Sequence, residues 1–112
     1  MIEIKETEAY QCSIYIAGNL TTIEQVCSEF CERGACVSFQ PTTFVYTCGV
    51  EHGAEIKFIS YTRFPKGREK WKADAISLAE MLLKRCYQHT CTVIDDEKST
   101  MLNRKFTNVK EK

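Results

Sequence analysis

Polar and apolar residues alternate along several short segments of the chain, which is the pattern of β-strands with one buried face. These segments are residues 10–17, 36–40, 42–48, 54–65 and 91–95, and the isoleucines at positions 2 and 4 predict a further short edge strand. Two longer segments repeat their apolar residues every three or four positions. They predict one helix that begins near Thr21 and ends at Gly34, and a longer helix over residues 68–88.

The first helix carries the sequence signals of a helix start and a helix stop. Thr21 and Glu24 have the spacing of a capping box, in which each side chain satisfies a free backbone N–H group of the first turn. The apolar stripe that follows includes Cys27 and Cys31, which we interpret as packing residues rather than a metal-binding pair. Gly34 supplies the left-handed residue that often ends a helix.

The segment 54–65 has the strongest strand pattern and predicts a central strand. Ile56 and Phe58 lie on its core face, whereas Glu55 and Lys57 begin the opposite face as a solvated charge pair. Further along, this second face carries Ile59, then Tyr61 and Arg63. An aromatic surface with one fixed cation favours a flat, anionic ligand.

Short connections between the predicted strands make them antiparallel neighbours. The chain therefore predicts an α+β fold, an antiparallel sheet of about five strands packed on two helices in the order strand, helix, three strands, long helix, strand. We expect a single domain over residues 1–109 and a disordered tail over 110–112. The apolar stripe of the long helix is wider than one sheet covers, so either the first helix or a second subunit covers the remainder.

Composition narrows the class of partner. The 112 residues include 15 basic and 15 acidic ones, so the chain lacks the basic surplus of proteins that bind long nucleic acid. Its 7 cysteines form no Cys-x-x-Cys pair and no secretory signal is present, which indicates the reducing cytoplasm. No apolar run is long enough to cross a membrane.

The sequence contains no motif that marks a catalytic centre or a cofactor site. Glycine-rich phosphate loops, nucleophile elbows and His-Glu-x-x-His are absent, so we expect no catalytic residue, no metal and no cofactor. Cys48 and His52 with His89 and Cys91 would offer four zinc ligands only if the two loops met in space. A Cys–His nucleophilic pair is a second alternative. The acidic run 95–97 we interpret as a solvated turn.

Binding residues are easier to nominate than catalytic ones. Arginine, aromatic rings and hydroxyl groups stack on bases and hold phosphate or ribose. The candidate ligand-binding residues are Arg63, Phe64, Tyr61, Thr42, Thr43, Tyr46, Asn103 and Arg104. A single sequence does not reveal whether they converge on one site.

Several short stretches resemble a family of small phage proteins. They are Ser-Ile-Tyr-Ile-Ala-Gly at 13–18, Pro-Thr-Thr at 41–43, Glu-His-Gly at 51–53 and Tyr-Thr-Arg-Phe-Pro at 61–65, together with the cysteine-bearing first helix. The chain resembles the Thoeris anti-defence sponges most. The resemblance implies a non-enzymatic, oligomeric protein of the host cytoplasm that sequesters cyclic ADP-ribose signals. It places Arg63 on phosphate or ribose, Phe64 near the base, and Arg104 as the second arginine expected near the end of the chain.

Three classes of function follow from these observations. The first is the nucleotide sponge, a homodimer or higher homo-oligomer with a cyclic nucleotide as its partner. The second is an inhibitor that binds a bacterial defence protein, as anti-CRISPR proteins do. The third, a small nucleotide hydrolase, has the least support because the catalytic motifs are missing.

Overall fold

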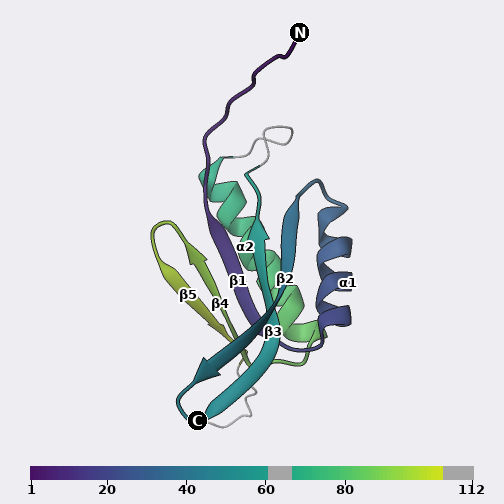
Figure 1. Cartoon of the computed structure of the whole chain (residues 1–112), viewed down its shortest axis with the longest axis vertical. Helices are drawn as coiled ribbons and strands as arrows, with labels where there is room; N and C mark the ends of the chain where they lie inside the picture. The colour runs from purple at the N-terminus through teal and green to yellow at the C-terminus, as the bar shows by residue number, and fades with distance from the viewer. Residues whose placement is uncertain (61–66, 105–112) are drawn as a thin grey trace.

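The computed structural model describes residues 1–60 and 67–104. The strands are β1 (Cys12–Ala17), β2 (Val37–Tyr46), β3 (Gly49–Phe58), β4 (Thr90–Asp95) and β5 (Ser99–Asn103), and the helices are α1 (Leu20–Cys31) and α2 (Arg68–Arg85). Figure 1 shows the β2–β3 hairpin extending beyond the rest of the sheet. None of the helices in the described residues is long and apolar enough to cross a membrane.

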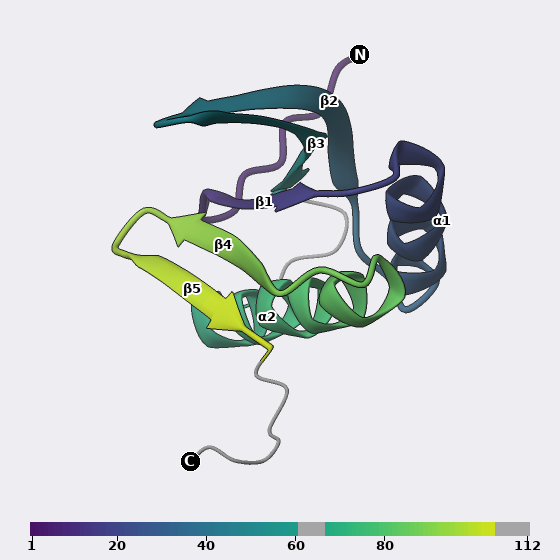
Figure 2. The ribbon, with the colours of Figure 1, turned by 90° about the horizontal axis from the view of Figure 1, so that it is seen from below.

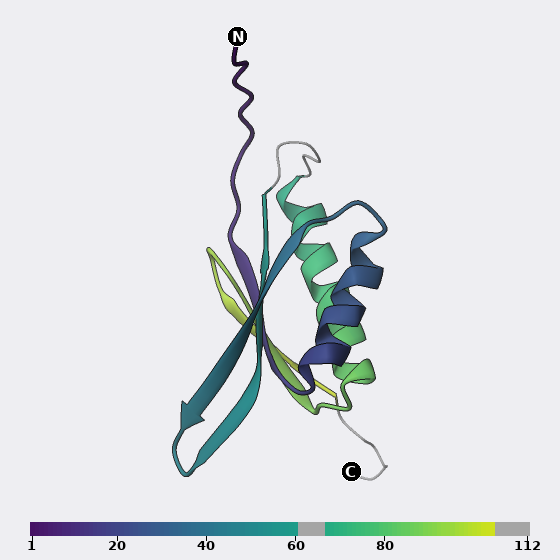
Figure 3. The same cartoon turned by 45° about the vertical axis from the view of Figure 1, so that its right-hand side comes forward.

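One antiparallel sheet carries all five strands in the order β2-β3-β1-β4-β5. Both helices pack on the same face of this sheet, and the opposite face carries no helix among the described elements (Figure 3). The predicted α+β fold class is therefore confirmed. The helix-covered face of the sheet encloses the core, whereas the opposite face is left for solvent, a ligand or a partner.

The core lies between the sheet and the two helices. Its largest fully buried side chains include Ile14, Ile56, Phe30, Leu78 and Leu82, contributed by β1, β3, α1 and α2. The predicted stripe of α2 is buried as expected, and α1 packs beside it on the sheet (Figure 2). Since α1 covers this flank of α2, a second subunit is not needed to bury the stripe.

Two boundaries between predicted strands differ from the observed ones. The segments 36–40 and 42–48 form one continuous strand, β2, in which Pro41 pairs with Ala54. An edge strand tolerates proline because half of its N–H groups face away from the sheet. The hairpin turn is Thr47-Cys48 rather than the glycine-containing residues 49–53, and Cys48 adopts a left-handed backbone with φ of 67°.

The capping of α1 also differs from the prediction. Asn19, not Thr21, is the N-cap, and its side-chain oxygen accepts a hydrogen bond from the backbone N–H of Thr22 at 2.9 Å. The helix therefore begins at Leu20. Asparagine is at least as good an N-cap as threonine. Gly18, with φ of 144°, lets the chain turn directly before Asn19, so the helix can begin there.

The first ten residues do not form the predicted edge strand. Residues 1–10 have no regular secondary structure, and the side chains of Ile2 and Ile4 are 89 % and 86 % exposed. Alternation alone is not enough for a strand, because a strand also needs a neighbour with which to pair. Figure 1 shows these residues running beyond the end of the sheet.

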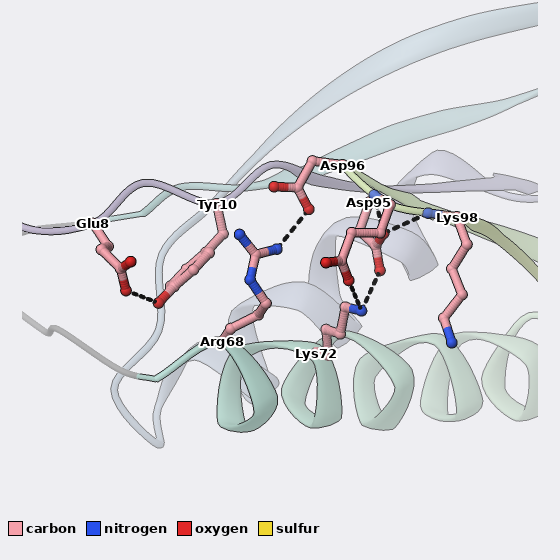
Figure 4. A network of polar contacts seen from close by, with 8 residues as sticks. Glu8, Tyr10, Arg68, Lys72, Asp95, Asp96 and Lys98 are labelled. Carbon is pink, nitrogen blue, oxygen red and sulfur yellow. Dashed lines mark hydrogen bonds and ion pairs between the residues drawn. The ribbon is translucent and has the colours of Figure 1, made fainter.

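A cluster of charged residues joins α2 to the turn between β4 and β5 (Figure 4). Arg68 pairs with Asp96 at 2.7 Å, and Lys72 pairs with Glu97 at 2.8 Å and with Asp95 at 3.3 Å. The acidic run 95–97 is thus a turn tied to α2 by ion pairs. Within the described residues no group of three or more His, Cys, Asp or Glu side chains is placed to hold a metal ion.

The Asp95 carboxylate is the most buried member of this cluster and gives the fold a dependence on pH. Burial alone raises the pKa of Asp95, but hydrogen bonds from the N–H groups of Glu97 and Lys98 and from Lys72 outweigh it and hold that pKa below its usual range. A depressed folded-state pKa stabilises the fold above the unfolded value of about 3.9, and this contribution is lost as the pH falls through the lower folded value.

Asp95→Asn is therefore expected to flatten the acid limb of the stability curve. The melting temperature of the wild type should fall as the pH goes from about 5 to 3, and that of Asp95→Asn should start lower and fall less. Thermal unfolding followed by circular dichroism measures both curves. Glu24→Gln, which removes one exposed carboxylate from α1, is the control, and equal slopes for Asp95→Asn and the wild type would contradict the assignment.

Candidate functional site

The open face of the sheet gathers polar and aromatic side chains from four strands. Register places Tyr15 opposite both Glu55 and Thr92, and Phe44 opposite Glu51. Side chains on a strand alternate between faces, so these residues lie on the face opposite the buried Ile14, Ile16 and Ile56. This face is the only large sheet surface in the described residues that no helix covers (Figure 3).

A hydrogen-bonded cluster around Glu55 lies near the middle of the open face. The hydroxyl groups of Ser13 and Tyr15 both donate to Oε2 of Glu55, at 3.4 and 3.3 Å. Among the described residues, no donor bonds the other oxygen, Oε1. Glu55 is half-buried and Ser13 is buried, so the carboxylate is fixed in place with one oxygen left to accept a hydrogen bond from a ligand.

An aromatic pair stands beside this carboxylate. The rings of Tyr15 and Phe44 meet edge to face, with centroids 6.4 Å apart and planes at 79°. Edge-to-face packing orients both rings without hydrogen bonds and leaves the π face of one ring available. Such a face accepts a flat base or a cation.

A cavity of about 310 Å³ opens next to the aromatic pair. Its walls come from β1, the hairpin, β4 and the segment between α2 and β4, and are formed by Tyr15, Ile16, Ala17, Phe44, Glu51, Gln88, His89, Thr90, Cys91 and Thr92. The volume suits a nucleoside-sized molecule. Glu51 and the nearby Glu55 give this region an excess of negative charge, which favours a cationic ligand rather than the anionic one expected from the sequence.

The sequence-based candidate residues do not form a single group in the structure. Thr42 and Thr43 point to opposite faces of β2, where Thr43 is within 3.3 Å of Nδ1 of His52. Tyr46, which is 52 % exposed, lies at the far end of the hairpin. Asn103 and Arg104 are at the end of β5, at the opposite end of the strand order.

Some of the candidate residues lie outside the described part of the chain. Tyr61, Arg63 and Phe64 belong to residues 61–66, so the binding roles assigned to them remain predictions.

Arg104 donates through Nη1 to the backbone oxygen of Leu83 at 3.4 Å, which ties the end of β5 to α2. Asn103 and Arg104 line a separate cavity of about 230 Å³ against α2, away from Glu55.

Sequence reasoning missed Glu55 and Tyr15. Glu55 was interpreted as half of a solvated charge pair with Lys57, but its hydrogen-bond partners are hydroxyl groups of β1, forty and forty-two positions earlier in the chain. Only the register between β1 and β3 brings these residues together. The only signal available beforehand was a glutamate on a predicted strand face that also carries Lys57, Ile59, Tyr61 and Arg63.

The buried cysteines do not suit the Cys–His nucleophilic pair that the sequence left open. All seven cysteines lie in the described residues, and each is a free thiol. Burial raises the pKa of Cys12 and Cys91 to about 11 and that of Cys27 to about 12, so these thiols are protonated at neutral pH and are poor nucleophiles.

The same fold occurs in a class of enzymes, the lyases. A phage SAM lyase in its apo state superposes with a TM-score of 0.70 and 13 % sequence identity, over 96 % of this chain and 100 % of that one. A phage SAM lyase in complex with S-methyl-5′-thioadenosine superposes with a TM-score of 0.64 and 14 % identity, over 92 % of this chain and 95 % of that one. No protein-family model and no curated protein matches the sequence.

These structural neighbours correct the function expected from the sequence. The expectation of a catalytically inert sponge for cyclic ADP-ribose is wrong, because two solved structures that share this fold over nearly the whole chain are phage SAM lyases. The protein-binding inhibitor and the nucleotide hydrolase do not match these neighbours either. The absence of catalytic motifs did not by itself exclude an enzyme, because an enzyme that mainly positions its substrate needs none of them.

Proposed function

We propose that this protein is a lyase that cleaves S-adenosylmethionine (SAM) and releases S-methyl-5′-thioadenosine. The observation that carries the proposal is the Glu55 cluster beside an aromatic pair and a cavity of about 310 Å³, on the open face of a fold shared with phage SAM lyases. SAM is a cation with a flat base, and this face supplies carboxylates and aromatic rings.

The reaction requires no cofactor and no proton transfer. SAM carries a sulfonium, an ammonium and a carboxylate. If its own carboxylate oxygen attacks Cγ of the methionine part, the C–S bond breaks and its electron pair stays on sulfur. The products are neutral S-methyl-5′-thioadenosine and homoserine lactone, which keeps the ammonium charge. The reacting groups belong to one molecule, so the protein acts by holding them in a reactive conformation and by excluding water.

The charge change during this reaction assigns a role to Glu55. The sulfonium loses its charge in the transition state, so a carboxylate beside sulfur would stabilise the substrate more than the transition state. The ammonium keeps its charge throughout. Glu55, held by Ser13 and Tyr15, therefore binds the ammonium through Oε1, while Tyr15 and Phe44 face the adenosyl part.

We infer that the protein works as a homo-oligomer in the cytoplasm of a host cell, with SAM as its small-molecule partner. The open face is broad and the hairpin extends away from the core, so a second copy on this face would close the site against water (Figure 1). Size-exclusion chromatography with light scattering, with and without S-methyl-5′-thioadenosine, tests this assembly. A single monomeric mass in both samples would contradict it.

Incubation of the purified protein with SAM tests the proposed activity. Liquid chromatography with mass spectrometry is expected to show S-methyl-5′-thioadenosine forming at the rate of SAM loss. The co-product must be compared with standards, because homoserine lactone and its isomer 2-aminobut-3-enoate have the same mass. Heat-denatured protein is the control, and SAM loss no faster than in buffer would overturn the proposal.

A further inference from the structure

Two cavities follow one another along α2 and β5, away from the Glu55 cluster, and we refer to them together as the α2–β5 groove. It contains a cavity of about 250 Å³ at its Lys72 and Lys98 end and one of about 230 Å³ at its Lys84 and Arg104 end. Between these ends the walls are largely apolar, with Ile76, Leu83, Val93 and Leu102 among them.

The dimensions of the groove are those of a short extended peptide. From Lys72 to Lys84 the helix rises about 18 Å, at 1.5 Å for each residue. From Lys98 to Arg104 the extended chain covers about 20 Å, at 3.3 Å for each residue. These two independent lengths agree, and five or six extended residues would fill the space. β5 is the last strand of the sheet in the described residues, so its outer edge can accept one more strand.

Residues 1–8 match this groove. Ile2 and Ile4 alternate with polar residues, which is the pattern of a strand with one buried face, yet both isoleucine side chains are almost fully exposed. The segment carries three glutamates, Glu3, Glu6 and Glu8, against one lysine, Lys5. The groove is lined by Lys72 and Lys98 with Asp95 at one end and by Lys84 and Arg104 with Glu80 at the other, so basic side chains are in excess at both ends and can pair with glutamates of the segment.

The contacts near Tyr10 direct residues 1–8 away from the groove of their own chain. The Tyr10 hydroxyl donates to Glu8 at 2.6 Å, the Ser60 hydroxyl donates to the backbone oxygen of Glu8 at 2.9 Å, and the Arg68 guanidinium lies 4.4 Å from the centre of the Tyr10 ring. Figure 4 shows Glu8 and Tyr10 beyond the start of α2, on the side away from Lys98. The segment therefore points outward from its own chain (Figure 1).

We propose that residues 1–6 of one copy bind the α2–β5 groove of a second copy. The segment pairs with the free edge of β5 as a sixth strand and places Ile2 and Ile4 over the apolar walls formed by Ile76, Leu83 and Leu102. This is β-strand addition, in which backbone hydrogen bonds provide affinity and alternate side chains provide specificity. The contact goes beyond the proposed lyase function, because it lies on the opposite side of the sheet from Glu55.

Analytical ultracentrifugation of the full chain over a range of concentrations tests this contact. The double variant Ile2→Glu, Ile4→Glu is expected to weaken self-association at least tenfold, whereas the matched variant Ile2→Leu, Ile4→Leu, which keeps apolar side chains at both positions, should change it less than threefold. The altered side chains are exposed, so neither variant should lose its fold. An unchanged association constant for the isoleucine variant, or a wild type that is monomeric throughout, overturns the proposal.

A photo-cross-linker locates the contact directly. With p-benzoylphenylalanine at position 4, irradiation is expected to give a covalent dimer whose cross-linked peptide includes part of residues 72–84 or 98–104. A cross-link within one chain, or to the hairpin of a second copy, would place the segment elsewhere and reject the proposal. Both readouts are masses rather than reaction rates, so a failure of the proposed lyase activity would leave them unaffected.

Discussion

Glu55→Gln is expected to lower kcat/KM for SAM cleavage about 100-fold, which corresponds to roughly 2.7 kcal/mol of transition-state stabilisation. The substitution keeps the size of the side chain and its acceptor oxygen, but it removes the charge that holds the substrate ammonium. Loss of a charge-assisted hydrogen bond has an effect of this size, and a misplaced reactive conformation has a similar one. Steady-state measurement of S-methyl-5′-thioadenosine release gives the ratio.

Binding of the product S-methyl-5′-thioadenosine is the main control for the Glu55→Gln variant, because the product lacks the ammonium group that Glu55 is proposed to bind. Its Kd for the Glu55→Gln variant, measured by calorimetry, should stay within about threefold of the wild-type value if Glu55 binds the ammonium. Glu24→Gln on α1 should leave both kcat/KM and Kd unchanged. An equal loss of affinity for SAM and for S-methyl-5′-thioadenosine would mean that Glu55 binds the adenosyl part instead.

The sequence predicted the fold well where hydrophobic periodicity and burial coincide. The stripe of α2 and the core faces of β1 and β3 are examples, because a residue such as Leu78 or Ile56 is buried whatever the exact strand order. Prediction was poorer where two local signals compete. Asn19 and Thr21 are both good helix caps. The five residues 49–53 have the composition of a loop because two of them are glycines, but they belong to β3.

The candidate site depends on information that no local pattern contains. Glu55 and Tyr15 are neighbours only because β1 inserts between β3 and β4 in the sheet, so that a strand from the start of the chain separates two later ones. Charge patterning treats Glu55 as solvated because its nearest sequence neighbour of opposite charge is Lys57. Strand order and register decide otherwise, and both are set by long-range packing.

Gly53→Ala is expected to destabilise the protein by about 3 kcal/mol or more, at the upper end of the effect of overpacking. A Cβ atom at position 53 would lie 2.0 Å from the backbone oxygen of Ile16 and 2.5 Å from Cα of Ala17. Neither atom can move aside alone, because Ala17 pairs with Gly53 and the N–H of Gly18 donates to the oxygen of His52 at 3.0 Å. Thermal unfolding should show a melting temperature lower by roughly 10–15 °C.

Gly49→Ala is the matched control, since it adds the same methyl group to the same strand. The atoms nearest to its Cβ would belong to the side chain of Tyr46, at 2.5 Å, and this half-exposed side chain at the end of the hairpin can rotate away. We expect a cost below about 1 kcal/mol. The difference between the two variants measures how closely β1 approaches β3, and this approach also sets the positions of Tyr15 and Glu55. If Gly53→Ala were as stable as Gly49→Ala, β1 would have room to shift and the Glu55 cluster would not be held rigidly.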